Sequence, residues 1–269
     1  MLVEKMHGCG NDFCVVSYDD GIDYSSLALK LCNRKTGVGS DGLVVVKTSP
    51  LEMLFYNADG SKAPMCGNGI RCFSKYAYEH KLIKRNKFDV MTGAGKMIIE
   101  ITSTNPFMCK VNMGSPIFNN SSIYVSDNLN SFGRLLEVND FKVTTYSFFM
   151  GTIHTVIFVY DFKDEVLSYA EEICFNKRYT KQTNVNFVQV IDKGHIKVKT
   201  FERGVGWTLA CGTGCCASVV AASKLGLTYK NVDVELELGH LEIELKKDSV
   251  FMTGPAVKVF ECEFKEEED

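Results

Sequence analysis

The sequence predicts an α/β fold of the α+β kind, built from two pseudo-symmetric domains related by an internal duplication. In each domain a barrel of strands is expected around one central helix. Three observations predict this architecture. The length of 269 residues suits two modest domains. A four-residue motif occurs once in each half, and the strand and helix patterns around its two copies match.

The repeated motif is C-G-x-G, which occurs as Cys66–Gly69 and again as Cys211–Gly214. The two cysteines lie 145 positions apart, and a strand-like segment ends nine residues before each of them, at Asn57 and at Glu202. After each motif the hydrophobic period changes from two to three or four, which indicates a helix. Because chance rarely places several features in the same order, these patterns predict a structural duplication.

The remaining elements follow from local periodicity. Alternation predicts strands, and apolar spacings of three and four predict helices. The predicted strands are Phe13–Tyr18, Leu43–Lys47, Leu51–Asn57, Lys96–Ile101, Thr155–Tyr160, Phe187–Ile191, Ile196–Phe201, Leu241–Leu245 and Val257–Phe264. The predicted helices are Tyr24–Asn33, a segment that includes Ile70 to Ala77, Glu165–Cys174 and Cys215–Leu225. The last of these is apolar all round and is expected to be buried.

The domain boundary is predicted near Ser115–Asn120, because Pro116 and the run Asn119–Ser122 are rich in turn formers. The first domain would comprise residues 1–117 and the second residues 118–254. The C-terminal segment 255–269 is expected to return to the first domain.

Composition excludes several classes of protein. Thirty Lys and Arg against 33 Asp and Glu give a net charge of −3, so no nucleic-acid partner is expected. No apolar run approaches the roughly 20 residues of a membrane span, so no membrane partner is expected. Eleven cysteines without a secretory signal indicate a reducing, cytoplasmic compartment in which thiols stay free.

The position of Cys66 and Cys211 at two helix starts indicates acid–base chemistry. Free N–H groups and the helix dipole at an N-terminus favour a thiolate and can also bind a carboxylate. If two such ends face one ligand, a thiolate removes a proton from one side of its α-carbon while a thiol delivers one to the other. The other nine cysteines are interpreted as structural.

Competing interpretations remain open at this stage. The two cysteines would be small core residues if the glycine motifs had another purpose. A metal is not expected, because C-x-x-C pairs are absent and the five histidines are scattered. A thioredoxin-type oxidoreductase lacks its motif for the same reason. A Cys–His hydrolase would leave the second cysteine of the repeated motif unexplained. The glycine-rich segment Gly37–Gly42 lacks both the G-x-G-x-x-G pattern and the Lys-Ser/Thr of a P-loop, so it is interpreted as a turn.

Three long motifs resemble the diaminopimelate epimerase family. They are Met6–Phe13 (MHGCGNDF), Asn57–Gly60 (NADG) followed by Met65–Cys72 (MCGNGIRC), and Glu202–Gly214 (ERGVGWTLACGTG). Thr183–Phe187 and Met150–His154 also resemble family segments, and the order fits over the whole chain. The resemblance implies an isomerase that needs no cofactor and that interconverts LL- and meso-diaminopimelate in lysine and peptidoglycan precursor synthesis. It also implies the diaminopimelate epimerase-like fold and, at family level, a homodimer.

The resemblance carries roles onto matching residues. It implies that Cys66 and Cys211 are the two catalytic bases, assisted by His154 and Glu202 respectively. The partner implied is a small-molecule amino-acid substrate, which would be held by Asn11, Asn57, Gly67, Asn68, Asn184, Glu202, Arg203, Gly212 and Thr213. Gly67, Asn68, Gly212 and Thr213 match the backbone donors to the reacting carboxylate. Asn11 matches a residue near the reacting end. Asn57, Asn184 and Arg203 match the group that holds the distal end, where Glu202 also contributes.

One position departs from the family pattern. Gly151-Thr152-Ile153-His154 stands where the family usually has Gly-Asn-Pro-His, and that Asn contributes to the distal carboxylate. Loss of one such contact would cost about 1 kcal/mol or be replaced by water. Two alternatives to diaminopimelate epimerisation therefore stay open: the same chemistry on another amino acid, such as lanthionine, and an amino-acid-binding module without catalysis.

Overall fold

The computed structural model describes residues 1–118, 123, 131–139 and 141–265. The chain divides into two compact units. Unit 1 comprises Met1–Val111 and Thr253–Asp269, and unit 2 comprises Asn112–Met252. The sequence predicts the domain boundary between residues 117 and 118, and the structure divides the chain between residues 111 and 112. The turn-rich run 119–122 lies outside the described residues.

Strands dominate both units. Those that begin in unit 1 are β1 (Leu2–Gly8), β2 (Asn11–Ser17), β3 (Gly42–Thr48), β4 (Leu51–Asn57), β5 (Lys62–Ala63), β6 (Lys87–Thr92), β7 (Gly95–Thr104), β8 (Phe107–Asn112) and β18 (Val257–Glu263). Those that begin in unit 2 are β9 (Phe132–Val138), β10 (Phe141–Met150), β11 (Thr152–Phe158), β12 (Asn184–Asp192), β13 (His195–Glu202), β14 (Gly206–Thr208), β15 (Asn231–Leu236), β16 (Gly239–Lys246) and β17 (Ser249–Pro255).

The helices are few and short. Unit 1 contains α1 (Tyr24–Cys32) and α2 (Gly67–Glu79), and unit 2 contains the 3-10 helix η1 (Glu165–Tyr169), α3 (Ala170–Cys174) and α4 (Gly212–Lys224). Among the described helices, none has both the length and the apolar character that crossing a membrane requires.

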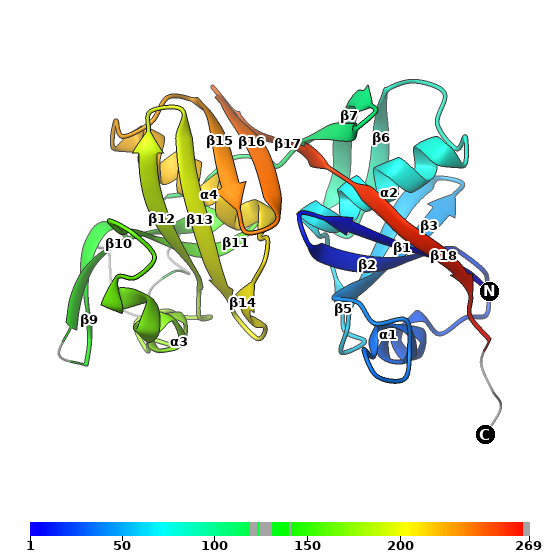
Figure 1. Ribbon diagram of the computed structural model, residues 1–269, viewed down its shortest axis with the longest axis horizontal. Coiled ribbons are helices and arrows are strands. Elements are labelled where there is room, and N and C mark those ends of the chain that lie inside the picture. Colours follow the sequence, from blue (N-terminus) through cyan, green and yellow to red (C-terminus); the bar gives the residue numbers. More distant parts are fainter. Residues whose placement is uncertain (119–122, 124–130, 140, 266–269) are drawn as a thin grey trace. The chain divides into compact units, whose positions relative to one another are not determined.

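The two units repeat one topology (Figure 1). In unit 1, β1 and β2 are antiparallel, β2 and β3 parallel, β3 and β4 antiparallel, β4 and β6 parallel, and β6 and β7 antiparallel. In unit 2, β10, β11, β12, β13, β15 and β16 repeat the same alternation of antiparallel and parallel pairs. Each parallel step passes through a helix, as a crossover requires. The predicted duplicated α/β fold is therefore confirmed.

Helices α2 and α4 occupy equivalent places inside the two units. Helix α2 contacts β1, β2, β3, β4 and β18, and α4 contacts β10, β11, β12, β13 and β16. Most residues of both helices are buried, including the charged side chain of Arg71 in α2. Arg71 donates from Nε to the carbonyl oxygen of Pro255 and from Nη1 to that of Gly67. This arginine joins the start of α2 to the C-terminal segment, whose strand β18 pairs with β1.

One predicted element is different in detail. The helix expected over 165–174 is a 3-10 turn that continues as a five-residue α-helix. Asp164 accepts a hydrogen bond from the N–H of Val166, and the Ser168 hydroxyl donates to the carbonyl oxygen of Glu165. Such local side-chain bonds compete with the α-helical pattern, which explains the tighter first turn. The glycine-rich segment Gly37–Gly42 leads from a loop into β3, in agreement with its interpretation as a turn.

Candidate active site

Cys66 is the N-cap residue of α2 in unit 1. Its backbone is extended, with φ −131° and ψ 124°, and its Sγ accepts a hydrogen bond of 3.4 Å from the N–H of Gly69. A Cβ at position 69 would lie 3.3 Å from both the Cβ of Cys66 and a methyl group of Val44. The second glycine of C-G-x-G therefore lets the thiol fold back onto the first turn. The half-buried sulfur stays at the positive end of the helix.

Asn11 and Asn68 form a polar network beside this helix start. The amide of Asn68, a buried residue, donates from Nδ2 to Oδ1 of Asn11 at 2.9 Å. Nδ2 of Asn11 in turn donates to Asp41 Oδ2 at 2.6 Å. Asp41 also accepts from Arg34, which donates to Asp12 as well. The loop between α1 and β3 thus supplies the carboxylate that orients Asn11.

Asn57 lies at the end of β4, where the chain makes a tight turn. The N–H of Gly60 donates to the carbonyl oxygen of Asn57, and Asn57 Nδ2 donates to the hydroxyl of Ser61. Gly60 has φ +79°, and a Cβ there would meet the carbonyl oxygen of Ser25 at 2.8 Å. The glycine of the N-A-D-G motif is therefore required by the turn itself.

Cys211 holds the equivalent N-cap position of α4 in unit 2, with φ −116° and ψ 104°. Here the glycine requirement is stricter. A Cβ at Gly214 would collide with Oδ1 of Asn186 and lie 3.2 Å from the Sγ of Cys211. Cys211 is 5% exposed, so its surroundings decide its charge state.

His154 lies at the centre of a buried hydrogen-bond network in unit 2. Asn186 Nδ2 donates to the carbonyl oxygen of Thr155 at 3.2 Å, and Asn186 Oδ1 accepts from the hydroxyl of Thr200 at 3.1 Å. These two partners fix the orientation of the Asn186 amide, so its Nδ2 also donates to Nδ1 of His154 at 3.1 Å. Burial lowers the pKa of His154 to about 3, and the neutral ring therefore carries its proton on Nε2.

The proton on His154 Nε2 sets the direction of the next hydrogen bond. Nε2 lies 3.0 Å from Oγ1 of Thr213, which must accept. The hydroxyl hydrogen of Thr213 is then available to Cys211 Sγ, at 3.6 Å. Asn186, His154 and Thr213 thus form a chain of donors that ends on the sulfur of Cys211.

Opposite influences act on Cys211. Burial raises the pKa of the Cys211 thiol well above its usual value, and the negative charge of Glu202 raises it further. The hydrogen bond from Thr213 lowers the same pKa. Glu202 ends β13 and accepts a hydrogen bond of 2.7 Å at Oε1 from the hydroxyl of Thr208, on β14. In this arrangement Cys211 is a thiol at neutral pH, with a carboxylate near it and a donor chain behind it.

The other residues expected in unit 2 lie at strand ends. Oδ1 of Asn184, the first residue of β12, accepts from the N–H of Arg203 at 2.9 Å. The Arg203 side chain is exposed and donates from Nη1 to the carbonyl oxygen of Lys181. Thr152 begins β11 and is half-buried, and a Cβ added at the neighbouring Gly151 would lie 3.3 Å from the methyl group of Thr213. The predicted action of His154 on Cys66 joins two units and stays a prediction.

Three residues of these networks were not singled out from the sequence: Asp41, Asn186 and Thr200. Asn186 and Thr200 are polar residues in otherwise buried stretches of strand. Because a buried polar side chain needs a partner, that contrast was the available signal. Asp41 is exposed and offered no such signal. All eleven cysteines are free thiols.

The fold is shared with solved structures that are less than 20% identical to this chain in sequence. The structure resembles a PhzF-family phenazine biosynthesis protein from Bacillus anthracis, with a TM-score of 0.74 and 18% identity over 98% of this chain and 99% of that one. It also resembles a probable proline racemase from Agrobacterium radiobacter, with a TM-score of 0.68 and 12% identity over 98% and 92% of the two chains. At these identities the likeness defines the fold class alone.

Sequence relatives define the family. The diaminopimelate epimerase family model matches residues 3–119 and 146–259. A diaminopimelate epimerase from Caldanaerobacter subterraneus is 42% identical over 98% of this chain and 100% of that one. Another from Halothermothrix orenii is 43% identical over 95% of both chains. The chain belongs to the diaminopimelate epimerase family.

Proposed function

We propose that this chain interconverts LL- and meso-diaminopimelate without a cofactor, as an isomerase of lysine and peptidoglycan precursor synthesis. The name diaminopimelate epimerase, shared by relatives over nearly the whole chain, supports this substrate. One observation carries the mechanism: two helices in topologically equivalent positions both begin at a cysteine N-cap.

The reaction moves one proton off the α-carbon and another onto its opposite face. A thiolate takes the α-proton and becomes a thiol, while the facing thiol gives up its proton and becomes a thiolate. Charge and atoms balance, and the enzyme ends in the reverse protonation state. The N–H groups of Gly67, Asn68, Gly212 and Thr213 would hold the α-carboxylate and stabilise the carbanion that develops beside it.

The surroundings of the two sulfurs support distinct resting roles. The half-buried Cys66 accepts an N–H at the helix start, which favours a thiolate and hence a base. Cys211 is buried near Glu202, which favours a thiol and hence an acid. Glu202 assists proton transfer at Cys211. The assistance of His154 to Cys66 belongs to the same proposal and rests on the family resemblance.

The distal end of the substrate would meet a second set of polar groups. Arg203 offers a planar fork to a carboxylate, while Asn57 and Asn184 offer both donors and acceptors to an ammonium beside it. Asn11 would contact the reacting end. The hydrogen bonds of Asn11 to Asp41 and Asn68 support this role, because they fix which amide atoms remain available.

The decisive experiment follows exchange at the α-carbon. Purified protein with LL-diaminopimelate in deuterated water should form the meso isomer and incorporate deuterium, as read by NMR. Cys66→Ala and Cys211→Ala should each abolish epimerisation. Full epimerisation by both single variants would sink the two-base scheme.

A second candidate, the same chemistry on another diamino dicarboxylic acid, is favoured by Thr152. This shorter side chain stands where the family usually has Asn, so the distal site has changed. Lanthionine and single amino acids, tested beside LL-diaminopimelate in deuterated water, distinguish the two substrates. Ligand binding without any exchange would instead indicate a binding module.

A homodimer and a cytoplasmic location complete the proposal. Strand β18 pairs with β1 and carries exposed apolar residues. Val257, Val259 and Phe260 are 43%, 56% and 45% exposed. A second copy of the chain would cover them. Sedimentation of the wild type beside Val259→Lys measures this: a dimer that becomes a monomer in the variant supports the interface, and a monomeric wild type excludes it.

A further inference from the structure

A three-stranded face of unit 2 gathers two of the five histidines. Strands β13 and β15 are parallel neighbours, and β15 and β16 are antiparallel neighbours. Ile196, Val234 and Leu241 point to the core and are buried. By the alternation of strands, the residues beside them in sequence point to the opposite face. That face carries His195, Asp233 and His240, which are half-buried or exposed.

The register explains why these residues meet although they are far apart in sequence. His195 pairs directly with Asp233, and Glu235, two residues further along β15, pairs with His240. Asp233 therefore stands between histidines on the two flanking strands. Cross-strand and diagonal neighbours on one face are within reach of long side chains.

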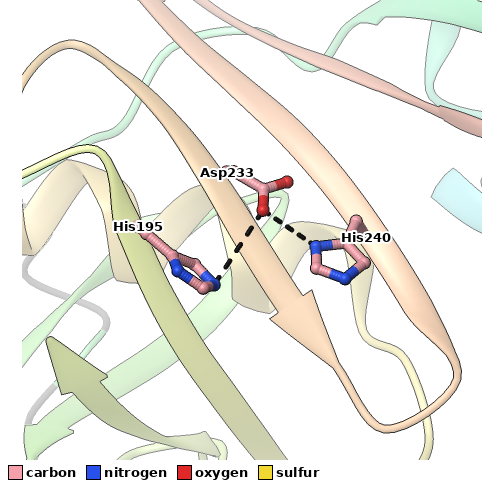
Figure 2. Close-up of side chains that lie close together, drawn as sticks. All are labelled: His195, Asp233 and His240. Carbon is pink, nitrogen blue, oxygen red and sulfur yellow. Dashed lines mark hydrogen bonds and ion pairs between the residues drawn. The ribbon is translucent and has the colours of Figure 1, made fainter. Parts of the chain in front are cut away.

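The donor atoms converge, as Figure 2 shows. Asp233 Oδ2 lies 2.8 Å from His240 Nδ1 and 3.9 Å from His195 Nε2. These three ligand atoms all lie within 4.8 Å of one another. His195 Nε2 is buried and has no hydrogen-bond partner within the described part of the chain. It lies 3.3 Å from Glu235 Oε2, whose second oxygen is bound to Lys197.

We propose that His195 Nε2, Asp233 Oδ2 and His240 Nδ1 bind one zinc ion, with water in the fourth position. Tetrahedral zinc with bonds of about 2.0–2.1 Å separates its ligand atoms by about 3.3 Å. The observed separations bracket that value, so small side-chain rotations complete the site. Two imidazoles favour zinc over magnesium or calcium, which prefer oxygen ligands. Glu235 Oε2 contacts the same nitrogen, His195 Nε2, so this ion pair gives way to the metal when zinc binds, and Glu235 keeps its ion pair with Lys197.

The site has a structural role. His195 is the first residue of β13 and Glu202 the last, which at about 3.3 Å per residue separates them by roughly 23 Å. The ion would therefore tie β13, β15 and β16 together at the end of β13 remote from Glu202. Zinc at about 100 times its dissociation constant should raise the melting temperature by roughly 5–10 °C without being needed for activity.

The experiment uses full-length, tag-free, reduced protein that has been freed of metal. Calorimetric titration with zinc and metal analysis after dialysis give affinity and stoichiometry. His195→Ala, Asp233→Asn and His240→Ala should each weaken binding at least tenfold and abolish the thermal shift. Glu242→Gln is the matched control: it removes a charge directly opposite Asp233 but no ligand, and should bind like the wild type.

Cobalt substitution separates this site from the cysteines. Cobalt on nitrogen and oxygen gives visible d–d bands without a thiolate-to-metal charge-transfer band in the near ultraviolet. One ion per chain with that spectrum, lost in the three ligand variants, supports the proposal. Absence of binding, equal binding by the ligand variants and wild type, or a thiolate band would each overturn it. None of these measurements depends on epimerase activity.

Discussion

Replacing Thr213 by Val tests the donor chain behind Cys211. Valine matches threonine in shape but cannot accept from His154 Nε2, at 3.0 Å, nor donate to Cys211 Sγ, at 3.6 Å. The backbone N–H of residue 213 is unchanged, so any binding of the substrate carboxylate by that group is retained. The substitution therefore isolates the hydroxyl.

The size of the effect follows from what the hydroxyl touches. In the transition state of the proposed reaction, the proton is being transferred at Cys211, and the sulfur carries part of a negative charge. A hydrogen bond to a charged group contributes about 1.5–3 kcal/mol, and each 1.36 kcal/mol is a factor of ten in rate. Because the Cys211–Thr213 contact is long, we expect the lower end, a loss in kcat/KM of roughly tenfold. The unpaired Nε2–H of buried His154 should also cost about 1–3 kcal/mol of stability.

The assay measures epimerisation in both directions over a range of pH. Both directions share one transition state and one equilibrium constant, so kcat/KM should fall by the same factor in each. Loss of the Thr213 hydrogen bond raises the pKa of Cys211 further, which moves the pH profile upward. Thr213→Ser keeps the hydroxyl and should behave like the wild type. A folded Thr213→Val protein with unchanged kcat/KM and pH profile would refute the reasoning.

Three further predictions concern packing and pH. Gly214→Ala should lower the free energy of unfolding by about 1–3 kcal/mol and remove most activity, because its Cβ would collide with Asn186. Gly69→Ala should lower the free energy of unfolding by less, because its Cβ would meet its neighbours at 3.3 Å. Chemical unfolding of the two variants measures the difference. Burial raises the pKa of Cys109 from 9.0 to about 12, so its contribution to stability is kept below pH 9 and lost as pH rises toward 12. Between pH 8 and pH 10, the free energy of unfolding measured in urea should therefore fall by about 1.4 kcal/mol less in Cys109→Ala than in the wild type. Burial raises the pKa of Asp12, but hydrogen bonds, first that of Arg34, lower it to about 2. The stabilisation that comes from this lowered pKa of Asp12 is present above pH 3.8 and is lost as the pH falls through 2. In acid unfolding, Arg34→Ala should remove about 1 kcal/mol of that stabilisation.

Local periodicity predicted the four helical segments and nine of the eighteen described strands; it did not predict β1, β5, β6, β8, β9, β10, β14, β15 and β17. The helix starts at Cys66 and Cys211 were visible because the motif changes the period from two to three or four. The 3-10 turn of η1 was not visible, since it depends on the hydrogen bonds of Asp164 and Ser168. Strand pairs far apart in sequence, such as β1 with β18, require tertiary structure to establish their register.

Side-chain networks were harder to predict than elements. His154, Asn186 and Thr200 lie on three different strands, so their hydrogen bonds depend on the registers of β11, β12 and β13. His195 and His240 illustrate the same point: 45 positions separate them in sequence, and only the pairing of β13, β15 and β16 brings both to Asp233. A spacing rule for metal ligands within one segment does not detect a site assembled across strands.

The duplication explains how one motif places two cysteines in different surroundings. Both cysteines cap equivalent helices, so both receive the same favourable field from the helix dipole. What differs is what each unit adds around its own copy. Cys66 is half-buried, whereas burial, and after it the negative charge of Glu202, raise the pKa of the Cys211 thiol. The hydrogen bond from Thr213 lowers the pKa of Cys211, which supports the thiolate that the proposed reaction requires. A reversible two-base reaction needs this combination, because a sulfur that could hold only one charge state would work in one direction and then stop.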